Sequence, residues 1–593
     1  MDLFDIAKEY LKLDQNPITN AHIKLLVDEK DTVSLNKLLS SRLTFGTAGL
    51  RAEMGSGYSR MNELTVIQAS QGLCAYYLEI IPDFKSRGVV IGHDHRHNSD
   101  SFARLTAAVF LAKGVKVYYY PDLVHTPLVP YGVTHFNAGC GIMITASHNP
   151  KQDNGYKVYA GNGCQIISPH DKEIADRIMK NLIPWTWDYK LVETSSLVTN
   201  PTSIIDKYFE KLASMSHFGL QNNTQNVKFC YTAMHGVGLS FAQRSFKAFN
   251  LIDFYPTPEQ MYPDPEFPTV KFPNPEEGEG ALALAMENAS RNDCAIILAN
   301  DPDADRLAIA EFQKSSGKWH IFTGNQIGVI LASFILQSYK EKNNGVLDPS
   351  LSLVTTTVSS HMLQEMAKVE GIKFDETLTG FKWLGNKAID LGEKGFNTVF
   401  AFEEAIGFMC YDAVRDKDGV SALGVFSEWA NHLYGQGKTV YEHLTSLYEK
   451  YGYWVSNNAY FICHDKQVIN AIFDKIRYGA NPIPDDGSYP YKLAYPEEIN
   501  GVKVVSVRDL TIGYDSSTSD HKPTLPVSAS SQMLTFRLAN DCLMTLRTSG
   551  TEPKIKYYTE YKGSSLEQGR TELDAMVKSM IDICLEPVLN NLQ

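Results

Sequence analysis

Four segments of the chain repeat one pattern, in which an apolar, strand-like run ends in a polar loop. The segments are GVVIGHD (88–94), GIMITASHNP (141–150), AIILANDPDADR (295–306) and TVFAFEEAIGF (398–408). A helical pattern, SFARLTAAVFLAKG (101–114), follows the first of them. Buried strands that alternate with helices have this pattern, so it predicts α/β layers. Because open α/β sheets bind ligands beyond the carboxyl ends of their strands, the last three loops predict one composite site.

The composition indicates an ordinary globular protein with several domains. At 593 residues the chain is about four times as long as a ~150-residue domain, so each domain is large enough to bury a core. Hydrophobic residues make up 44% and charged residues 21% of the chain, as is usual for globular proteins. The net charge of -13 argues against nucleic acid or an anionic membrane as the main partner.

Signals for export or membrane insertion are absent from the sequence as it stands. The segment MDLFDIAKEYLKLD lacks the basic start and apolar core of a secretory signal. The most apolar run, IGVILASFIL (327–336), is much shorter than the ~20 residues of a membrane helix. The nine cysteines form no CxxC pair, which indicates reduced thiols and no zinc site. We therefore expect a cytoplasmic protein.

Composition shifts along the chain predict four domains. TSSLVTNPTS (194–203) is typical of a linker, and YPTPEQMYPDPEFPTVKFPNPEEGEG (255–280) is rich in proline and predicts an ordered or lid-like loop. We expect α/β domains at 1–203, 204–322 and 323–452, with the TASHNP, DPDADR and FEEAIG loops, and a C-terminal α+β domain at 453–593 with the loop RTSGTEPK.

The loop that opens with Ser147 is ambiguous on its own, because Ser, Asn and Pro are common where a strand gives way to a turn. A hydrolase nucleophile elbow requires G-x-S-x-G, and here Thr145 and Asn149 occupy the glycine positions. The role of Ser147 therefore depends on the other loops.

The loop NDPDADR (300–306) is a candidate metal site. Asp301, Asp303 and Asp305 stand at alternate positions, which turns three carboxylates to the same side of an extended loop. Converging carboxylates suit Mg²⁺, although turn-forming aspartates are the alternative. An EF-hand is excluded, because Arg306 and Phe312 stand where that motif requires a glycine and a carboxylate.

RTSGTEPK (547–554) has the composition of a phosphate-binding loop, or of a turn followed by a helix cap. Arg547 supplies a guanidinium, and Gly550 lets backbone amides approach an anion closely. By contrast, YGQGKT (434–439) is no Walker loop, because the required first glycine falls on His432.

Three further segments give weaker signals, each of which also fits an ordinary turn or a solvated surface. FEEAIGF (402–408) offers Glu403 and Glu404, whose carboxylates accept hydrogen bonds from a sugar diol. GFKW (380–383) offers Lys382, and FGTAGLRAE (45–53) offers Arg51.

Together these segments resemble the α-D-phosphohexomutase superfamily. Its hallmarks are a TASHNP serine loop, a D-x-D-x-D-R metal loop, a G-E-E-x-x-G-like sugar loop and an R-x-S-G-T phosphate loop, and this chain has all four in that order. GTAGLR and HGVG (235–238) match as well. EEAIGF, GFKWLG, CHD (463–465) and RTSGTEPKIKYY are similar to the phosphopentomutase/phosphoglucomutase type-2 branch, and this likeness extends along nearly the whole chain.

One departure bears on the substrate. The glucose-specialised branch has GEESFG in the sugar loop, whereas this chain has Phe402 for the glycine and Ala405 for the serine. Loss of that hydroxyl removes one sugar contact, so we expect a pentose phosphate to be a better substrate than glucose phosphate.

The resemblance implies a fold and an activity. The fold would be three consecutive α/β domains with mixed sheets around a central cleft, plus a smaller TBP-like α+β domain. The activity would interconvert ribose or deoxyribose 1- and 5-phosphates, and glucose 1- and 6-phosphates, through a phosphoserine and a bisphosphorylated sugar. It implies one Mg²⁺ per subunit, a glucose 1,6- or ribose 1,5-bisphosphate primer, small phosphorylated sugars as partners, and a monomer or weak dimer.

The resemblance also implies residue roles. Ser147 would carry the phosphoryl group and bind the metal with Asp301, Asp303 and Asp305. Arg51, Lys157 and Arg306 would line the transfer site, and either His148 or Lys157 would move the proton. The implied substrate-binding residues are Thr379, Gly380, Lys382, Glu403, Glu404, Lys417, Arg547, Thr548, Ser549, Gly550, Thr551 and Lys554.

Two other functions remain open from the sequence. A glucose-1,6-bisphosphate synthase has the same loops and takes its phosphoryl group from 1,3-bisphosphoglycerate. A catalytically silent homologue would serve as a regulatory or binding protein.

Overall fold

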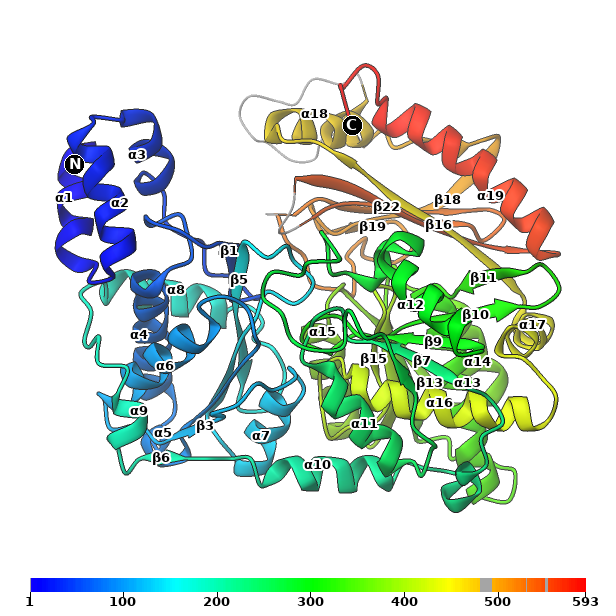
Figure 1. Cartoon of the computed structure of the whole chain (residues 1–593). Helices are drawn as coiled ribbons and strands as arrows, with labels where there is room; N and C mark the ends of the chain where they lie inside the picture. Colours follow the sequence, from blue (N-terminus) through cyan, green and yellow to red (C-terminus); the bar gives the residue numbers. More distant parts are fainter. Residues whose placement is uncertain (1, 480–492, 530, 550–552) are drawn as a thin grey trace. The chain divides into compact units, whose positions relative to one another are not determined.

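The computed structural model describes residues 2–479, 493–529, 531–549 and 553–593 (Figure 1). The chain divides into two compact units. Unit 1 contains Met1–Val354 and Gly380–His443, and unit 2 contains Thr355–Thr379 and Leu444–Gln593. Unit 2 therefore combines the last part of the chain with an internal segment, which carries α14 (Met362–Glu370) and β13 (Lys373–Thr377).

Three helices open unit 1: α1 (Leu3–Leu13), α2 (Pro17–Asp28) and α3 (Thr32–Leu39). Their apolar faces form a small core of their own, in which the rings of Tyr10 and Tyr58 meet edge to face. The Asn16 side chain caps α2 by accepting hydrogen bonds from the N–H groups of Ile18 and Thr19.

The first sheet of unit 1 is mixed, with the strand order β1-β5-β4-β2-β3-β6. β2 pairs in parallel with β3 and β4, whereas β5 is antiparallel to β4 and β1. The strands are β1 (Leu50–Glu53), β2 (Val89–His93), β3 (Val117–Tyr119), β4 (Cys140–Ile144), β5 (Asp153–Ala160) and β6 (Val198–Thr199).

Helices cover both faces of this sheet, which explains why its central strands are apolar throughout. The helices are α4 (Glu63–Ile80), α5 (Phe84–Arg87), α6 (Ser99–Leu111), α7 (Leu128–Phe136), α8 (His170–Lys180) and α9 (Leu191–Thr194). Val89 and Ile91 of β2 join the core on the side of α4 and α6, whereas Val90 lies against Gly132 of α7 on the other side (Figure 1).

The second sheet of unit 1 has the order β11-β10-β9-β7-β8. β7 is parallel to β8 and β9, and β10 is antiparallel to β9 and β11. The strands are β7 (Phe229–Thr232), β8 (Tyr255–Pro256), β9 (Ile296–Ala299), β10 (Ala308–Gln313) and β11 (Lys318–Ile321). The helices are α10 (Ile204–Ala213), η1 (Gly219–Asn223), α11 (Gly238–Ala248), η2 (Pro275–Glu277) and α12 (Glu279–Arg291).

The third α/β region of unit 1 contains β12 (Leu351–Thr356), β14 (Asn397–Glu403) and β15 (Gly407–Met409). β14 and β15 form an antiparallel pair, and α13 and α15 pack against β14. The helices are α13 (Gly324–Lys342), α15 (Phe381–Glu393), α16 (Gly419–Gly435) and α17 (Val440–Tyr451), the last of which continues into unit 2. Thr323 opens α13 with a capping box, near the position where the sequence predicts a third unit to start.

Unit 2 is built on an antiparallel sheet with the order β16-β22-β21-β20-β18-β17, and β19 pairs with β18. α19 packs on β16 and β22. The strands are β16 (Tyr453–Ile462), β17 (Glu498–Ile499), β18 (Val502–Asp509), β19 (Tyr514–Asp515), β20 (Met533–Leu538), β21 (Leu543–Thr548) and β22 (Lys554–Gly563). The helices are α18 (Lys466–Tyr478), α19 (Leu566–Met580) and η3 (Ile581–Leu585).

A cluster of charged side chains joins the internal segment of unit 2 to the sheet. The Arg508 guanidinium donates to Glu376 (2.6 Å) and to the Thr357 hydroxyl. His361 Nδ1 lies 3.2 Å from Glu560 Oε2, and its Nε2 lies 3.8 Å from Glu376 Oε2. Burial alone would lower the pKa of His361, but these two carboxylates raise it to about 9.

This cluster predicts a loss of stability in mild alkali. The pKa of His361 is higher in the folded chain than the ordinary 6.5, so its stabilising contribution is complete below pH 6.5 and is lost as the pH rises towards 9. The free energy of unfolding should fall by up to ~3 kcal/mol more in the wild type than in His361→Gln between those pH values. Urea unfolding at several pH values measures this difference, and equal slopes would contradict it.

The predicted fold class is confirmed: three consecutive α/β regions with mixed sheets precede a C-terminal region rich in strands. The segment 194–203, which is typical of a linker, ends directly before α10. It also contains β6, in which Val198 and Thr199 pair in parallel with Val117 and Tyr118 of β3. Pairing with the edge of an existing sheet outweighs the turn-like composition around these two residues.

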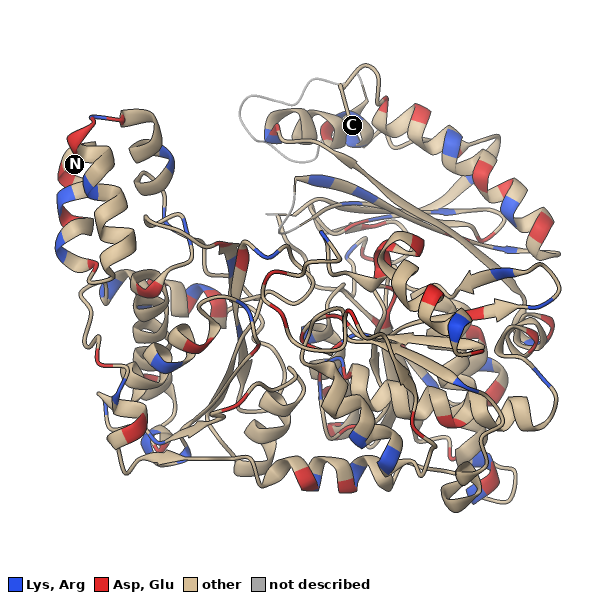
Figure 2. Ribbon diagram, in the orientation of Figure 1, with Lys and Arg blue, Asp and Glu red and all other residues tan. Residues whose placement is uncertain are grey.

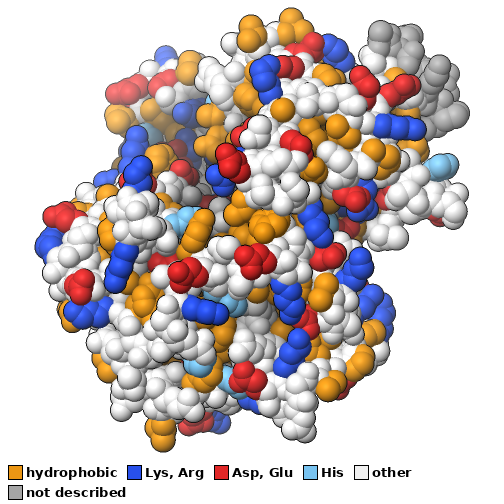
Figure 3. All heavy atoms as spheres, turned by 90° about the vertical axis from the view of Figure 1, so that its right-hand side faces the viewer, with side chains coloured by type: hydrophobic (Ala, Val, Ile, Leu, Met, Phe, Trp, Pro, Cys, Tyr) orange, Lys and Arg blue, Asp and Glu red, His pale blue; other side chains and the backbone are white. Residues whose placement is uncertain are grey.

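Charges are dispersed over the surface of each unit. Acidic and basic residues are interspersed along α19 (Figure 2). Figure 3 shows a face on which acidic and basic side chains lie among groups of hydrophobic ones. Among the described residues, no helix has both the length and the apolar character needed to cross a membrane.

Candidate functional site

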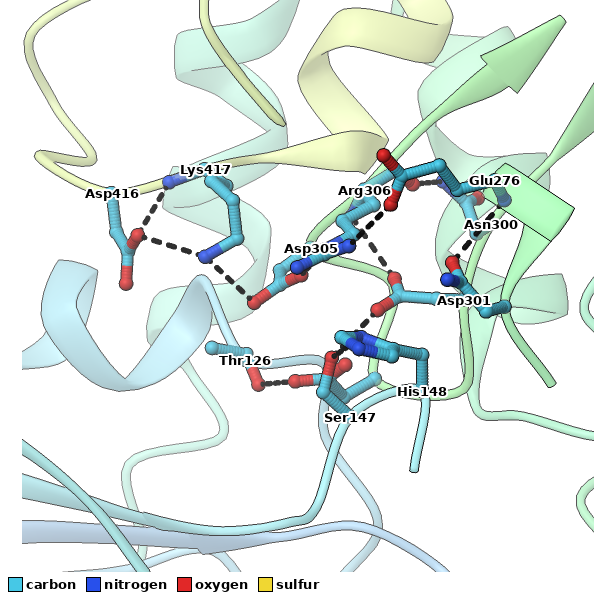
Figure 4. A network of polar contacts seen from close by, with 12 residues as sticks. Thr126, Ser147, His148, Glu276, Asn300, Asp301, Asp305, Arg306, Asp416 and Lys417 are labelled. Atoms are coloured by element: carbon cyan, nitrogen blue, oxygen red, sulfur yellow. Dashed lines mark hydrogen bonds and ion pairs between the residues drawn. The ribbon is translucent and has the colours of Figure 1, made fainter. Parts of the chain in front are cut away.

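Three loops of unit 1 that carry the predicted site residues begin where buried strands end. Ser147 follows β4, the aspartate loop 300–306 follows β9, and Glu403 closes β14. The serine loop and the aspartate loop meet in one polar network, which also includes Lys417 (Figure 4). The ends of β4 and β9 thus bring the predicted serine and aspartate loops together within unit 1.

Ser147 is buried and held in an unusual conformation. Its exposed fraction is 3%, and its φ of +54° lies in the left-handed region, which few residues other than glycine adopt. The Ser147 N–H donates to Thr145 Oγ1 at 2.9 Å, which fixes the turn. The Ser147 hydroxyl donates to Asp301 Oδ2 at 2.8 Å, so it points at the aspartate loop (Figure 4).

Arg96 holds the backbone of the serine loop in place. The sequence analysis did not predict a role for this residue. The guanidinium donates to four backbone carbonyl oxygens, those of Ser147 (2.6 Å), Asn149 (2.6 Å), Pro150 (2.8 Å) and Asp153 (3.2 Å). Arg96 lies just beyond β2, in the loop after GVVIGHD. The signal that could have found it is this position beyond a strand end, which it shares with the other three loops.

The aspartate triplet converges as the alternate spacing predicts. Asp301, Asp303 and Asp305 have no exposed surface, and one oxygen of each lies within 4.8 Å of the others. Lys157 Nζ donates to Asp303 Oδ2 at 2.6 Å and to Asp305 Oδ2 at 2.9 Å. Thr126, a second residue that the sequence did not reveal, donates its hydroxyl to the same Asp303 oxygen.

Burial and neighbouring charges set the protonation of this triplet. Burial raises the pKa of Asp301 well above its usual range, and Asp303 and Asp305 raise it further. Burial also raises the pKa of Asp305, but Lys157 and Lys417 outweigh it and lower the pKa. Burial thus favours the neutral form of Asp301, whereas two buried lysines favour the charged form of Asp305.

The residues present fit a divalent cation. The three donors are carboxylates, the hard oxygen ligands that Mg²⁺ prefers. Asp303 Oδ1 and Asp305 Oδ1 are buried without a hydrogen-bond partner among the described residues, although each carboxylate's other oxygen is paired. Unpaired buried carboxylate oxygens are costly, and a bound cation would satisfy them.

Lys417 forms ion pairs with the aspartate loop and with its own neighbour Asp416. Its Nζ lies 3.2 Å from Asp305 Oδ2 and 3.3 Å from Asp416 Oδ1. Burial raises the pKa of Glu403 to about 7, against the opposing effect of Lys417. Asp416, also missed in the sequence, accepts a hydrogen bond from the Tyr159 hydroxyl at 2.9 Å and so helps to hold the loop of Lys417.

The remaining predicted residues of unit 1 lie around these loops. His148 Nδ1 is 3.3 Å from Ser147 Oγ, and burial together with Arg306 and Arg51 lowers the pKa of His148 well below its usual value. The Arg51 guanidinium donates to Asn149 Oδ1 at 3.2 Å. Arg306 Nη1 lies 3.5 Å from Glu276 Oε2 (Figure 4).

Gly380, Lys382 and Glu404 complete the predicted set in unit 1. Gly380 precedes α15 with a φ of +102°, a conformation that glycine adopts readily. Lys382 donates to the Thr47 hydroxyl, within GTAGLR. Glu404 follows β14 directly, next to Glu403.

Unit 2 carries the predicted phosphate-binding residues. Arg547, on β21, donates to the Thr379 hydroxyl, so the structure brings two predicted residues together from distant parts of the chain. The Thr548 N–H donates to the carbonyl oxygen of Gln532 at 3.0 Å, and the Ser549 N–H to that of Lys554 at 2.9 Å. Gly550 and Thr551 lie outside the described residues.

Comparisons with known proteins match most of the chain. Models of three domains of one family match in sequence order: phosphoglucomutase/phosphomannomutase α/β/α domain I at residues 42–182, domain II at 206–314 and domain III at 323–451.

Individual relatives extend the likeness. A mouse (Mus musculus) phosphopentomutase is 47% identical over 99% of this chain and 95% of its own length. A human (Homo sapiens) glucose 1,6-bisphosphate synthase is 44% identical over 98% of this chain and 93% of its own. The open form of parafusin, a phosphoglucomutase from Paramecium, has the same fold with a TM-score of 0.66 at 19% identity, covering 92% of this chain and 96% of that one.

Proposed function

The chain belongs to the phosphoglucomutase/phosphomannomutase family, and from this premise we propose that it is a mutase that interconverts pentose 1- and 5-phosphates and, less efficiently, glucose 1- and 6-phosphates. The observation that carries the proposal is the Ser147 hydroxyl, buried and 2.8 Å from Asp301 beside two further aspartates. That arrangement supports a role for the Ser147 oxygen as phosphoryl carrier, because the charge of a transferring group could be neutralised there.

Ser147 is the phosphoryl carrier in this proposal. A sugar bisphosphate primer phosphorylates it, and the phosphoryl group then passes to the free hydroxyl of the sugar phosphate. The bond between Ser147 Oγ and phosphorus breaks, and a bond between the sugar oxygen and phosphorus forms. The sugar hydroxyl proton passes, by way of His148 or Lys157, to Ser147 Oγ, which leaves as a hydroxyl group. The bisphosphate turns around and returns its other phosphoryl group to Ser147, which restores the phosphoenzyme.

Charge stabilisation is the main task of the site, because uncatalysed phosphate-monoester chemistry is among the slowest known reactions. Asp301, Asp303 and Asp305 would hold Mg²⁺, which supplies positive charge next to the transferring group. Lys157, Arg306 and Arg51 add protein cations near the serine loop. Burial excludes water, which would otherwise hydrolyse a phosphoserine.

Unit 2 would bind the phosphate that does not react. Arg547 has the planar guanidinium that forms bidentate contacts with phosphate, and Thr379 lies against it. Thr548, Ser549 and Thr551 offer hydroxyl groups, and Lys554 follows them at the start of β22.

Arg547→Ala should raise the KM for the sugar phosphate. Loss of a charge-assisted contact worth ~1.5–3 kcal/mol corresponds to about a 10- to 150-fold increase in KM. Arg537→Ala, on the exposed side of the neighbouring strand β20, is the matched control and should leave KM unchanged. Steady-state kinetics compare the two, and an unaltered KM for Arg547→Ala would count against the phosphate role.

Substrate preference would follow from the sugar loop. Ala405 has no hydroxyl to offer a hexose. Phe402 is fully buried, and its ring fills the space left by Gly328 of α13, where a Cβ atom would lie 2.7 Å from the ring. Phe402 thus packs β14 against α13 next to Glu403, and its own side chain is not exposed to a ligand.

The preference can be measured as kcat/KM on ribose 1-phosphate and on glucose 1-phosphate, with Mg²⁺ and a trace of bisphosphate present. We expect a higher value on ribose 1-phosphate, and Ala405→Ser should narrow the ratio by up to ~10-fold, the size of one hydrogen bond. A preference for glucose 1-phosphate in the wild type would refute the pentose assignment and leave the mutase assignment intact.

The second candidate function is synthesis of glucose 1,6-bisphosphate. It is favoured by the human relative of that name, at 44% identity over nearly the whole chain. The phosphoryl donor distinguishes the two functions. A synthase consumes 1,3-bisphosphoglycerate stoichiometrically, whereas a mutase needs only catalytic amounts of a sugar bisphosphate.

A further inference from the structure

The proline-rich segment 255–280 has a fixed shape although little of it is helix or strand. Hydrogen bonds tie it to the end of the second sheet: the His235 N–H donates to the Gln260 carbonyl oxygen at 2.9 Å, and Thr232 Oγ1 donates to Gln260 Oε1 at 2.7 Å. His235 Nε2 lies 2.7 Å from Thr269 Oγ1. These bonds set the position of the residues between Gln260 and Thr269.

Phe267, in the middle of this stretch, packs on the arginine that holds the serine loop. Its ring centroid lies 5.0 Å from Arg96 Cζ and 5.2 Å from the His95 ring. Phe267 is 4% exposed and has a φ of +46°, which is strained for a bulky side chain. Such a conformation persists only when the surroundings fix it, so Phe267 is held firmly against Arg96.

Glu266 bridges the two loops that meet at Arg96. Its Oε1 lies 2.6 Å from His97 Nε2, next to Arg96 in the chain, and its Oε2 lies 2.7 Å from Lys151 Nζ, in the loop of Ser147. These three side chains are about half exposed, and none of them touches the aspartate triplet in the described contacts.

We infer that Phe267 and Glu266 are positioning residues for Ser147, which act through Arg96, His97 and Lys151. Phe267 limits the movement of the guanidinium whose four carbonyl contacts shape the serine loop. Glu266 ties the ends of the same two loops together. The inference rests on the proposed role of Ser147 as phosphoryl carrier, since a displacement of ~1 Å from in-line geometry reduces turnover by up to ~100-fold.

The test is the effect of Phe267→Ala and Glu266→Gln on kcat and KM of the full chain with ribose 1-phosphate. Phe267→Ala should lower kcat ~10- to 100-fold and leave KM within about twofold, because Phe267 is buried against Arg96 and acts through the serine loop. Phe267→Leu, which refills most of the volume, should recover most of kcat.

Glu266→Gln should lower kcat about threefold, in keeping with exposed ion pairs. Glu259→Gln, in the same segment and without an ion pair among the described residues, is the matched control.

A folded Phe267→Ala enzyme with unchanged kcat, or one in which only KM changes, would overturn the inference. If Phe267→Ala does not fold, Glu266→Lys decides. It removes both contacts of Glu266 and puts a second positive charge beside Lys151, so it should lower kcat ~10-fold at constant KM. Ser147→Ala separates the two claims. Activity in Ser147→Ala would refute the proposed function, whereas an inactive Ser147→Ala beside a fully active Glu266→Lys would refute the positioning role alone.

Discussion

Ser147→Ala should abolish mutase turnover and leave the protein folded. Without the hydroxyl there is no oxygen to carry the phosphoryl group, and loss of a nucleophile lowers kcat by ~10⁴-fold or more. The folded state loses one hydrogen bond, from Ser147 Oγ to Asp301 Oδ2, which is worth ~1 kcal/mol. The melting temperature should therefore fall by only a few degrees, about 2–4 °C for a domain of this size.

The control for this experiment is Ser101→Ala. The Ser101 hydroxyl donates to the Asn98 carbonyl oxygen at 3.2 Å in the first turn of α6, away from the serine loop. Kinetics with ribose 1-phosphate and a thermal melt on both variants give the comparison. Substantial turnover by Ser147→Ala would remove the phosphoserine from the mechanism.

Asp303→Asn should weaken Mg²⁺ binding by ~100-fold or more, since the change removes a full negative charge from a set of three hard ligands. The asparagine side chain has nearly the same size, so the contacts of Asp303 with Thr126 and Lys157 lose charge while the packing is kept. Calorimetric titration of Mg²⁺ into the protein measures the affinity directly, without relying on activity.

Asp293→Asn provides the matched control for the metal experiment. Asp293 is exposed, precedes β9 and lies at the opposite end of that strand from the triplet. Its substitution should leave the affinity unchanged. Equal affinities for wild type and Asp303→Asn would place the cation elsewhere.

Local patterns in the sequence revealed the loops because each loop is one short segment beyond a strand. The alternate spacing of Asp301, Asp303 and Asp305 is enough to predict that their side chains converge, and the structure shows that they do. The apolar runs before Ser147 and Asp301 are buried strands, as their composition predicts.

Partners from distant parts of the chain escaped the sequence analysis. Arg96 contacts a loop about fifty residues further along the chain, and Asp416 contacts Tyr159 across 257 residues. No spacing rule links such pairs, because only the completed sheet brings them together. The same reason explains β6, whose two residues become a strand through pairing with β3.

The central claim is that Ser147 carries the phosphoryl group, and mass spectrometry of the protein tests it most directly. The protein is incubated with Mg²⁺ and glucose 1,6-bisphosphate, digested and mapped. The account predicts one phosphoryl group on Ser147. This group should be lost when excess ribose 5-phosphate is added, because it passes to the sugar and the resulting ribose bisphosphate dissociates. An active enzyme with no phosphoryl group on Ser147, or with the group on another residue, would contradict it.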